Sequence, residues 1–136
     1  MNGTDLIQVL LNLAANAFQA SALPLQVEIF GEYFDDAVPP AVLADSPRSV
    51  FINREGFVNE PPIVALRVSD TGPGIPDSVL PRIFDSYFTT KSPGEGTGLG
   101  LAIVRRLVSE ANGGIHVQTE PQRGTTFTVF LPVEVG

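Results

Sequence analysis

The sequence predicts one α+β domain of two layers, in which helices cover one face of a mostly antiparallel sheet. Two segments, 5–22 and 101–111, contain neither Gly nor Pro and have the length of helices. Two strand-like segments near the C-terminus, 115–119 and 125–133, are separated only by the turn 120–124, which predicts an antiparallel hairpin. With 136 residues and a hydrophobic fraction of 43%, the chain is long enough for a single layered core.

The first helix is expected over residues 5–22, with Thr4 or Asp5 as its N-cap. Its side chains are apolar on nearly all sides, which is typical of a helix buried against a sheet. The second helix, over residues 101–111, is expected to end at Asn112, where two glycines follow.

Further strands are expected where short apolar segments are bounded by turn residues. Residues 25–30 alternate apolar and polar side chains, and residues 63–69 lie between two prolines and a glycine turn. Residues 77–84 are expected to form a short helical stretch. The long stretch 31–62 is rich in Pro and Asp and contains only one strand-like segment, 49–53. It predicts either a functional insertion or a solvated loop.

The composition excludes several functional classes. Eight Lys and Arg stand against fifteen Asp and Glu, so the net charge is −7, and the basic patch of a nucleic-acid surface is missing. The absence of cysteine excludes disulfides, thiolate metal sites and a cysteine nucleophile. No apolar run approaches the ~20 residues that span a bilayer, and the start lacks the basic region of a signal peptide. We therefore expect a cytoplasmic domain that makes no direct membrane contact.

A glycine-rich loop leads into the second helix and predicts an anion-binding site. Its glycines leave backbone N–H groups uncovered, and the helix N-terminus adds its positive dipole end. The loop is not a dinucleotide fingerprint, because Leu99 or Leu101 stands where the third glycine must be. It is not a P-loop either, because Lys91 precedes the glycines instead of following them. A surface loop without a ligand is the alternative interpretation.

Two asparagines of the first helix are candidate ligands. Asn12 and Asn16 are four residues apart, so their side chains share one helix face. Their amide groups can bind a hard cation through oxygen or donate to a phosphate through nitrogen. Contact with solvent or with a neighbouring loop is the alternative.

A third candidate lies at the end of a predicted strand. Asp70 is followed by Gly72 and Gly74. The carboxylate can accept a hydrogen bond from an amino group, and the glycines leave room for a flat ring, so the pattern favours a purine. An ordinary turn is the alternative.

In this order the motifs resemble the N, G1, F, G2 and G3 boxes of the GHKL ATPase superfamily, and within it the catalytic ATP-binding domain of a sensor histidine kinase. The resemblance covers most of the chain apart from residues 31–62. It implies the Bergerat fold, a two-layer α/β sandwich with a mixed, mostly antiparallel sheet and helices on one face. The matching segments are 12–17, 70–75, 82–91, 96–101 and 124–127.

The resemblance assigns these residues roles in binding ATP and Mg²⁺. It implies that Asp70 accepts from the adenine amino group and that Thr125 closes the pocket through its hydroxyl or a water. It further implies that Asn16, assisted by Asn12, coordinates Mg²⁺, and that Lys91 reaches the terminal phosphates. Asn12 and Lys91 would thereby act in catalysis. The implied nucleotide-binding residues are Asn12, Asn16, Asp70, Gly72, Gly74, Ile75, Thr90, Lys91, Gly96, Thr97, Gly98, Leu99, Gly100, Leu101 and Thr125.

Asn12 also bears on the reaction type. The hydrolysing members of the superfamily carry Glu at this position to activate water, and Asn cannot act as a base at neutral pH. The resemblance therefore implies transfer of the γ-phosphoryl group to a histidine on a separate dimerisation domain of the same kinase, which then serves a response regulator. A serine kinase of the anti-sigma-factor type is one alternative. A regulatory module that binds nucleotide weakly or not at all is another, favoured by Gln19 and Glu95, which depart from the family pattern as Ser86 does.

The phosphoacceptor is not expected within this chain. His116 is the only histidine and lies in a predicted strand, whereas the acceptor of the family sits on a helix and precedes an acidic residue. The strand that normally precedes the first-box helix is also missing. We therefore expect residues 1–136 to be one catalytic domain, truncated at its N-terminus, from a parent protein that is either free or anchored in a membrane.

Overall fold

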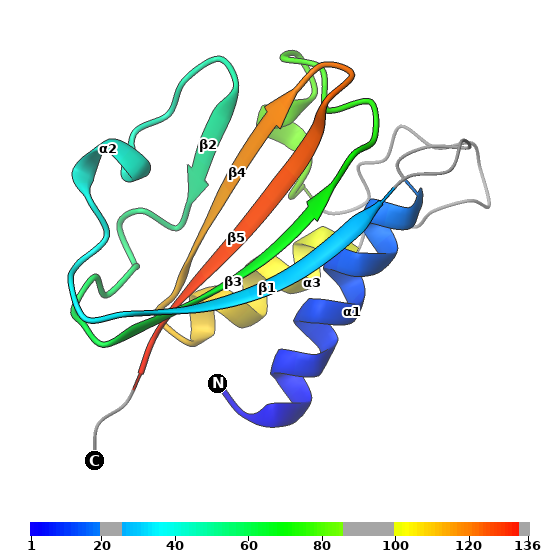
Figure 1. The fold of residues 1–136 in the computed structure, drawn as a ribbon. Helices are drawn as coiled ribbons and strands as arrows, with labels where there is room; N and C mark the ends of the chain where they lie inside the picture. The colour runs from blue at the N-terminus through cyan, green and yellow to red at the C-terminus, as the bar shows by residue number, and fades with distance from the viewer. Residues whose placement is uncertain (20–25, 86–99, 134–136) are drawn as a thin grey trace.

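The computed structural model describes residues 1–19, 26–85 and 100–133 (Figure 1). The order of their elements confirms the α+β class. In chain order the elements are α1 (Gly3–Gln19), β1 (Val27–Phe34), α2 (Pro40–Leu43), β2 (Ser49–Ile52), β3 (Ile63–Asp70), the 3₁₀ turn η1 (Leu80–Arg82), α3 (Gly100–Glu110), β4 (Gly114–Glu120) and β5 (Gly124–Pro132).

The described strands form one five-stranded sheet in the order β1-β3-β5-β4-β2. Every pairing between them is antiparallel, and the hairpin of β4 and β5 turns where the sequence predicts it. β3 and β5 lie next to each other in the sheet. Their register joins Asp70 to Thr125 at one end and Ile63 to Pro132 at the other.

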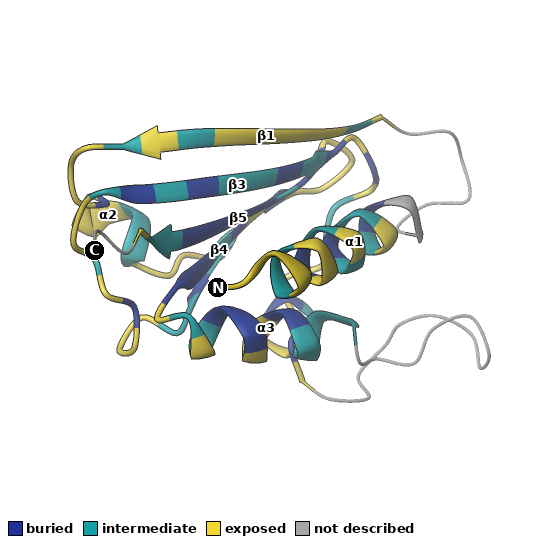
Figure 2. Cartoon of the chain, turned by 90° about the horizontal axis from the view of Figure 1, so that it is seen from below, coloured by how far each residue is buried: buried dark blue, intermediate teal, exposed yellow. Residues whose placement is uncertain are grey.

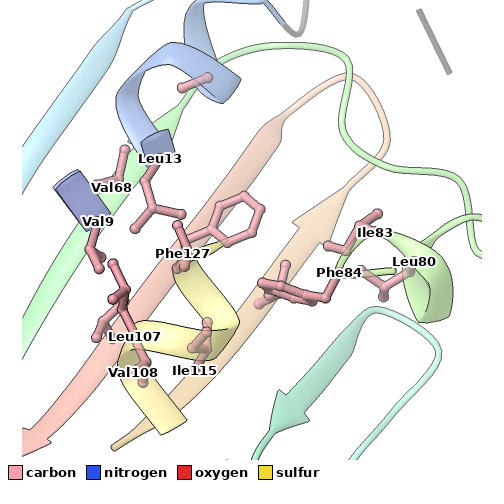
Figure 3. Close-up of a cluster of buried hydrophobic side chains, with 14 residues drawn as sticks. Val9, Leu13, Val68, Leu80, Ile83, Phe84, Leu107, Val108, Ile115 and Phe127 are labelled. Atoms are coloured by element: carbon pink, nitrogen blue, oxygen red, sulfur yellow. The ribbon is translucent and has the colours of Figure 1, made fainter. Parts of the chain in front are cut away.

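The helices α1 and α3 cover one face of this sheet, as predicted (Figure 2). Alternation along the strands sends Val68 of β3 and Phe127 of β5 to this face, where they meet Val9 and Leu13 of α1 (Figure 3). Burial of this apolar surface holds the helices on the sheet. The other buried members of the cluster are Ala17, Leu80, Ile83, Phe84, Val104, Leu107, Val108, Ile115, Val117 and Val129.

The stretch predicted to be helical at 77–84 contains only the one-turn η1. Phe84 has the packing role expected of it, because its ring meets Phe127 edge-on with 6.2 Å between the ring centroids. Tyr87 and Phe88, for which the same role is expected, lie outside the described residues.

The opposite face of the sheet carries a second, smaller core, which the sequence did not predict. The stretch 31–62 begins as the outer half of β1, then folds back over the sheet through α2 and β2, and β2 pairs with β4 (Figure 1). The strand expected at 25–30 corresponds to β1, which begins at Val27 and continues to Phe34. The buried residues of this second core are Val38, Phe51, Phe57, Ile63, Ala65 and Phe130.

Helix α1 differs from the prediction in its start and its exposure. Its cap is Asn2, whose Oδ1 accepts from the Asp5 amide at 2.8 Å, rather than Thr4 or Asp5. Its apolar surface is not buried on all sides, since Ile7 is 59% and Leu11 is 64% exposed. A helix that packs on a sheet in two layers covers the sheet with one face and leaves the other outside. Within the described ranges, no helix combines the length and the hydropathy that a bilayer crossing requires.

The difference between the two faces of α1 can be tested with one substitution at two positions. Leu13 is fully buried, so Leu13→Ala should lower the free energy of unfolding by about 3 kcal/mol, through lost burial and the cavity left behind. Leu11→Ala removes the same atoms from an exposed position and should change it by less than about 0.5 kcal/mol. Urea denaturation followed by circular dichroism measures both. Equal losses for the two variants would show that α1 is not packed as described.

Candidate functional site

The described members of the predicted site lie on the helix-covered face, at one end of the sheet. Asp70 ends β3 and pairs with Thr125, near the start of β5. A Cβ added to Gly100, the first residue of α3, would lie 3.9 Å from Oδ1 of Asn12 on α1. Because α1 also packs on β3, the described parts of the predicted site gather where these elements meet.

Asp70 is the buried carboxylate of this site. It is 8% exposed and its Oδ1 accepts from the Gly72 amide at 2.9 Å. Burial raises the pKa of Asp70 because desolvation disfavours the charged form, and backbone hydrogen bonds from Gly72 and Thr125 partly oppose this shift. A carboxylate has more acceptor positions than these two bonds occupy, so Asp70 can accept another hydrogen bond from a ligand.

The turn after Asp70 is fixed against the β4–β5 hairpin. Gly74 has φ 81°, and a Cβ at this position would overlap the Glu120 carbonyl, so only glycine fits. The Ile75 amide donates to Thr119 Oγ1 at 2.8 Å. Gly124, with φ 127°, approaches the Asp70 carbonyl so closely that a Cβ would collide with it. The turn and the hairpin therefore lie in direct contact and together form one wall of the site.

Thr125 is buried beside Asp70, but its hydroxyl already has a protein partner. It shares a hydrogen bond of 2.9 Å with the Thr119 hydroxyl, which also lies 3.3 Å from the Gly124 carbonyl. Thr119 is a site residue that the sequence reasoning missed. The predicted hairpin contained the signal, because a turn at 120–124 places Thr119 directly opposite Thr125.

Asn12 provides an unsatisfied donor at the other side of the site. Its Nδ2 is buried and has no hydrogen-bond partner among the described residues. The first amides of α3 begin at Gly100, beside this side chain, and a helix N-terminus favours an anion. A phosphate oxygen satisfies both groups, so these residues fit the phosphate end of a nucleotide. Asn16 follows one turn later on the same face of α1 and is half-buried.

The described residues also limit how a metal could be held. They contain no group of three or more His, Cys, Asp or Glu side chains that could hold a metal ion. Mg²⁺ does not need such a group, because it keeps several waters and takes phosphate oxygens as ligands. One or two amide oxygens from Asn12 and Asn16 are a sufficient protein contribution.

Part of the predicted site lies outside the described residues. Gly100 and Leu101 begin α3, and Leu101 packs against the helix-face core. The predicted roles in the loop before α3 stay predictions, as do the departures from the family pattern at Gln19, Ser86 and Glu95. The predicted loop residues outside the described ranges are Thr90, Lys91, Gly96, Thr97, Gly98 and Leu99.

The fold and this site define an ATP-binding α+β sandwich domain. Residues 1–135 match the family described as histidine kinase-, DNA gyrase B-, and HSP90-like ATPase. The chain belongs to this family, which confirms the resemblance drawn from the sequence motifs.

Within this family, the chain is similar to sensor histidine kinases. The chain is 35% identical over 132 residues to the sensory histidine kinase/phosphatase NtrB of Azospirillum brasilense, and the match covers 97% of this chain and 30% of NtrB. The nucleotide-free catalytic domain of the histidine kinase ThkA superposes with a TM-score of 0.66 at 28% identity, covering 96% of this chain and 69% of that one. Full-length ShkA in complex with AMPPNP superposes with a TM-score of 0.65 at 28% identity, covering 97% of this chain and 22% of ShkA.

These matches identify the chain as a catalytic domain of the sensor-histidine-kinase type. The match spans 30% of the length of NtrB and 7% of the length of the sensor kinase CckA of Brucella abortus, so it covers less than a third of these relatives. The fold predicted from the motifs is confirmed by the solved structures.

The raised pKa of Asp70 predicts a pH dependence. Because the pKa of Asp70 is higher in the folded protein than its unfolded-state value of 3.8, the folded state binds the proton more tightly. The resulting stabilisation is fully present below the unfolded-state pKa and is lost as the pH rises through the folded-state pKa. The wild type should therefore gain stability relative to Asp70→Asn as pH falls from 7 to 4. A tenfold difference in proton affinity between the folded and unfolded states corresponds to about 1.4 kcal/mol. Urea denaturation of both proteins over this range measures the gain, and a constant difference would contradict the buried placement of the carboxyl.

Proposed function

We propose that this chain is the ATP-binding catalytic domain of a two-component sensor histidine kinase. It transfers the γ-phosphoryl group of ATP to a histidine on a separate dimerisation domain of the same kinase. The observation that carries the proposal is the amide of Asn12, buried beside the first residue of α3 with no hydrogen-bond partner among the described residues, on the same face of the sheet as the buried Asp70 carboxylate. ShkA, a structure similar to this chain, is a complex with the ATP analogue AMPPNP.

The adenine end of the pocket is formed by Asp70 and the turn that follows. The carboxylate accepts a hydrogen bond from the exocyclic amine, which distinguishes adenine from guanine because guanine has a carbonyl oxygen at that ring position. Gly72 and Gly74 leave one side of the ring free of side chains, and Ile75 borders it. Since the hydroxyls of Thr125 and Thr119 are hydrogen-bonded to each other, the pair of them closes this side of the adenine pocket.

The phosphate end is formed by α1 and α3. Asn12 donates to a phosphate oxygen, and the amides at the start of α3 stabilise the same negative charge. Asn16, assisted by Asn12, supplies amide oxygen to Mg²⁺, which neutralises charge on the triphosphate when bound. By resemblance, Lys91 reaches the terminal phosphates, and the glycine-rich residues before Gly100 close over them.

The identity of residue 12 favours transfer over hydrolysis. A water molecule needs a base near the γ-phosphate, and the Asn12 amide cannot accept a proton at neutral pH. A histidine imidazole is a nucleophile without such help, so positioning and charge neutralisation suffice for the transfer. We therefore propose slow ATP turnover by the domain alone.

The acceptor histidine comes from outside this chain. His116, the single histidine, lies on β4 and points to the face of the sheet opposite α1 and α3. The sheet itself separates it from Asn12 and Asp70. The proposed partners are the dimerisation domain that carries the acceptor and, after it, a response regulator. Because the substrate is ATP, we expect the domain to act in the cytoplasm, whether or not the parent protein has a membrane anchor.

Nucleotide binding is tested with two variants and a matched control. Asp70→Ala removes the acceptor for the adenine amine, and Asn16→Asp places a negative charge beside the phosphates, so each should weaken binding of a fluorescent ATP analogue with Mg²⁺ by at least about 10-fold. Asn2→Asp adds the same charge at the far end of α1 and keeps the cap, so it should bind normally. Unchanged affinity of Asp70→Ala and Asn16→Asp would refute the pocket.

The acceptor assignment is tested with radiolabelled ATP. This chain alone, in wild-type form and as His116→Gln, should take up no label, because His116 lies on the wrong face of the sheet. Acid-labile label that appears on the wild type and is absent from His116→Gln would refute the assignment. Acid-stable label on serine or threonine would favour the serine-kinase alternative.

A further inference from the structure

The second face of the sheet contains a cavity of about 320 Å³ between the strands and the folded-back stretch that carries α2. Its volume lies at the lower end of the range of small-molecule sites. Its apolar wall comprises Phe34, Val42 and Phe130, of which Val42 belongs to the folded-back stretch and the two Phe residues to the strands β1 and β5. Its polar floor comprises side chains of β3, β4 and β5. The nucleotide site is on the opposite face, so this cavity is a separate feature.

The apolar wall is held in place by specific bonds rather than by contact alone. Asn59 makes a reciprocal pair with Val38, accepting from its amide at 2.7 Å and donating to its carbonyl at 2.9 Å. Asp45 accepts from the Phe51 amide at 2.9 Å. The rings of Phe51 and Phe130 stack at 6.2 Å beneath this segment. The cavity therefore has a preformed shape, which lowers the entropy cost of binding.

The polar floor carries one positive charge and no carboxylate. The described lining residues include Arg67 but neither Asp nor Glu, although the whole chain has a net charge of −7. Arg67 Nη1 donates to Glu32 Oε1 at 2.7 Å, and Glu32 does not line the cavity. The guanidinium carbon also lies over the Phe30 ring, 5.9 Å from its centroid, and Phe30 does not line the cavity either. Because a guanidinium has five N–H donors in its plane, the bond to Glu32 leaves others for a ligand.

The neighbours of Arg67 in the cavity are neutral groups that can hydrogen-bond. Burial lowers the pKa of His116, and the positive charge of Arg67 lowers it further, while Asp45 acts in the opposite direction. Thr128 is 3% exposed and pairs with both Arg67 and His116 in the sheet register. Gln118 adds an amide to the same floor. An apolar wall together with one cation and several neutral hydrogen-bonding groups matches a ligand with an apolar body and one anionic end.

We propose that this cavity binds a small organic monocarboxylate with an aromatic or branched aliphatic body. The carboxylate accepts from N–H groups of Arg67 that the bond to Glu32 does not use, and the body lies against the Phe34, Val42 and Phe130 wall. Arg67 keeps its bond to Glu32 on one edge of the guanidinium and holds the ligand on another. The site is independent of the proposed kinase function, because it uses none of the nucleotide-site residues.

Phenylacetate is a suitable probe, with phenylacetamide as a ligand of the same shape and no charge. In a ¹⁵N NMR titration, phenylacetate should shift the amide resonances of Val38, Val42 and Thr128 and saturate in the millimolar range or below. Phenylacetamide should bind at least about 10-fold more weakly, because it lacks the charge that pairs with Arg67. The absence of shifts at these residues, or equal affinity for the two probes, would overturn the proposal.

Two variants with matched controls test the same site from the side of the protein. Arg67→Gln should weaken phenylacetate binding about 10-fold, whereas Arg123→Gln, in the exposed turn between β4 and β5, should not change it. Val42→Phe should fill the cavity and abolish binding, whereas Val58→Phe, outside the lining, should not. Dispersion of the NMR spectrum shows which variants are folded. Retained affinity in a folded Arg67→Gln or Val42→Phe protein would overturn the proposal.

Discussion

The antiparallel register between β3 and β5 determines where both sites of this molecule lie. Side chains alternate between the two faces of a sheet, so a fixed register assigns every residue of the two strands to one face. Asp70 and Thr125 are paired on the face that α1 and α3 cover. Arg67 and Thr128 are paired three positions away, on the opposite face. A slip of one residue would exchange the two sets, and the large apolar cluster under the helices makes such a slip very unfavourable.

The same packing explains how the nucleotide site can hold groups that are unfavourable in the empty protein. Helix α1 packs on the sheet through Val9 and Leu13, and beside them the buried amide of Asn12 has no hydrogen-bond partner among the described residues. An unsatisfied buried donor of this kind lowers the stability of the folded state by about 1–3 kcal/mol. Asp70 is a carboxylate whose burial raises its pKa. A ligand that accepts from Asn12 and donates to Asp70 removes both penalties at once. The apolar core between the two groups supplies the stability that tolerates them.

The sequence predicted the parts of the fold that depend on local patterns and missed those that depend on distant contacts. The long helices, the hairpin and the glycine turn after Asp70 have signals within a few residues, and the motif resemblance added their arrangement. The N-cap was misplaced because several residues near the start are acceptable caps, and only the backbone geometry selects Asn2. The path of the stretch 31–62 depends on contacts such as that of Asn59 with Val38, 21 residues apart, which no local pattern identifies. The far-face cavity was hidden for the same reason, since only the folded chain brings its wall and floor together.

The two sites share the strands β3 and β5. Ser69 and Thr126 are bonded at 2.9 Å on the far face, one position before Asp70 and one after Thr125. Coupling between two ligands requires an element with two arrangements that both ligands influence. Among the described residues, β3 and β5 pair continuously from Ile63 to Asp70, in a single arrangement. A carboxylate bound in the far-face cavity would hold the folded-back stretch on the sheet, which stabilises the domain by mass action. The stretch 31–62 therefore forms one side of the proposed far-face site, which shares no residue with the nucleotide site.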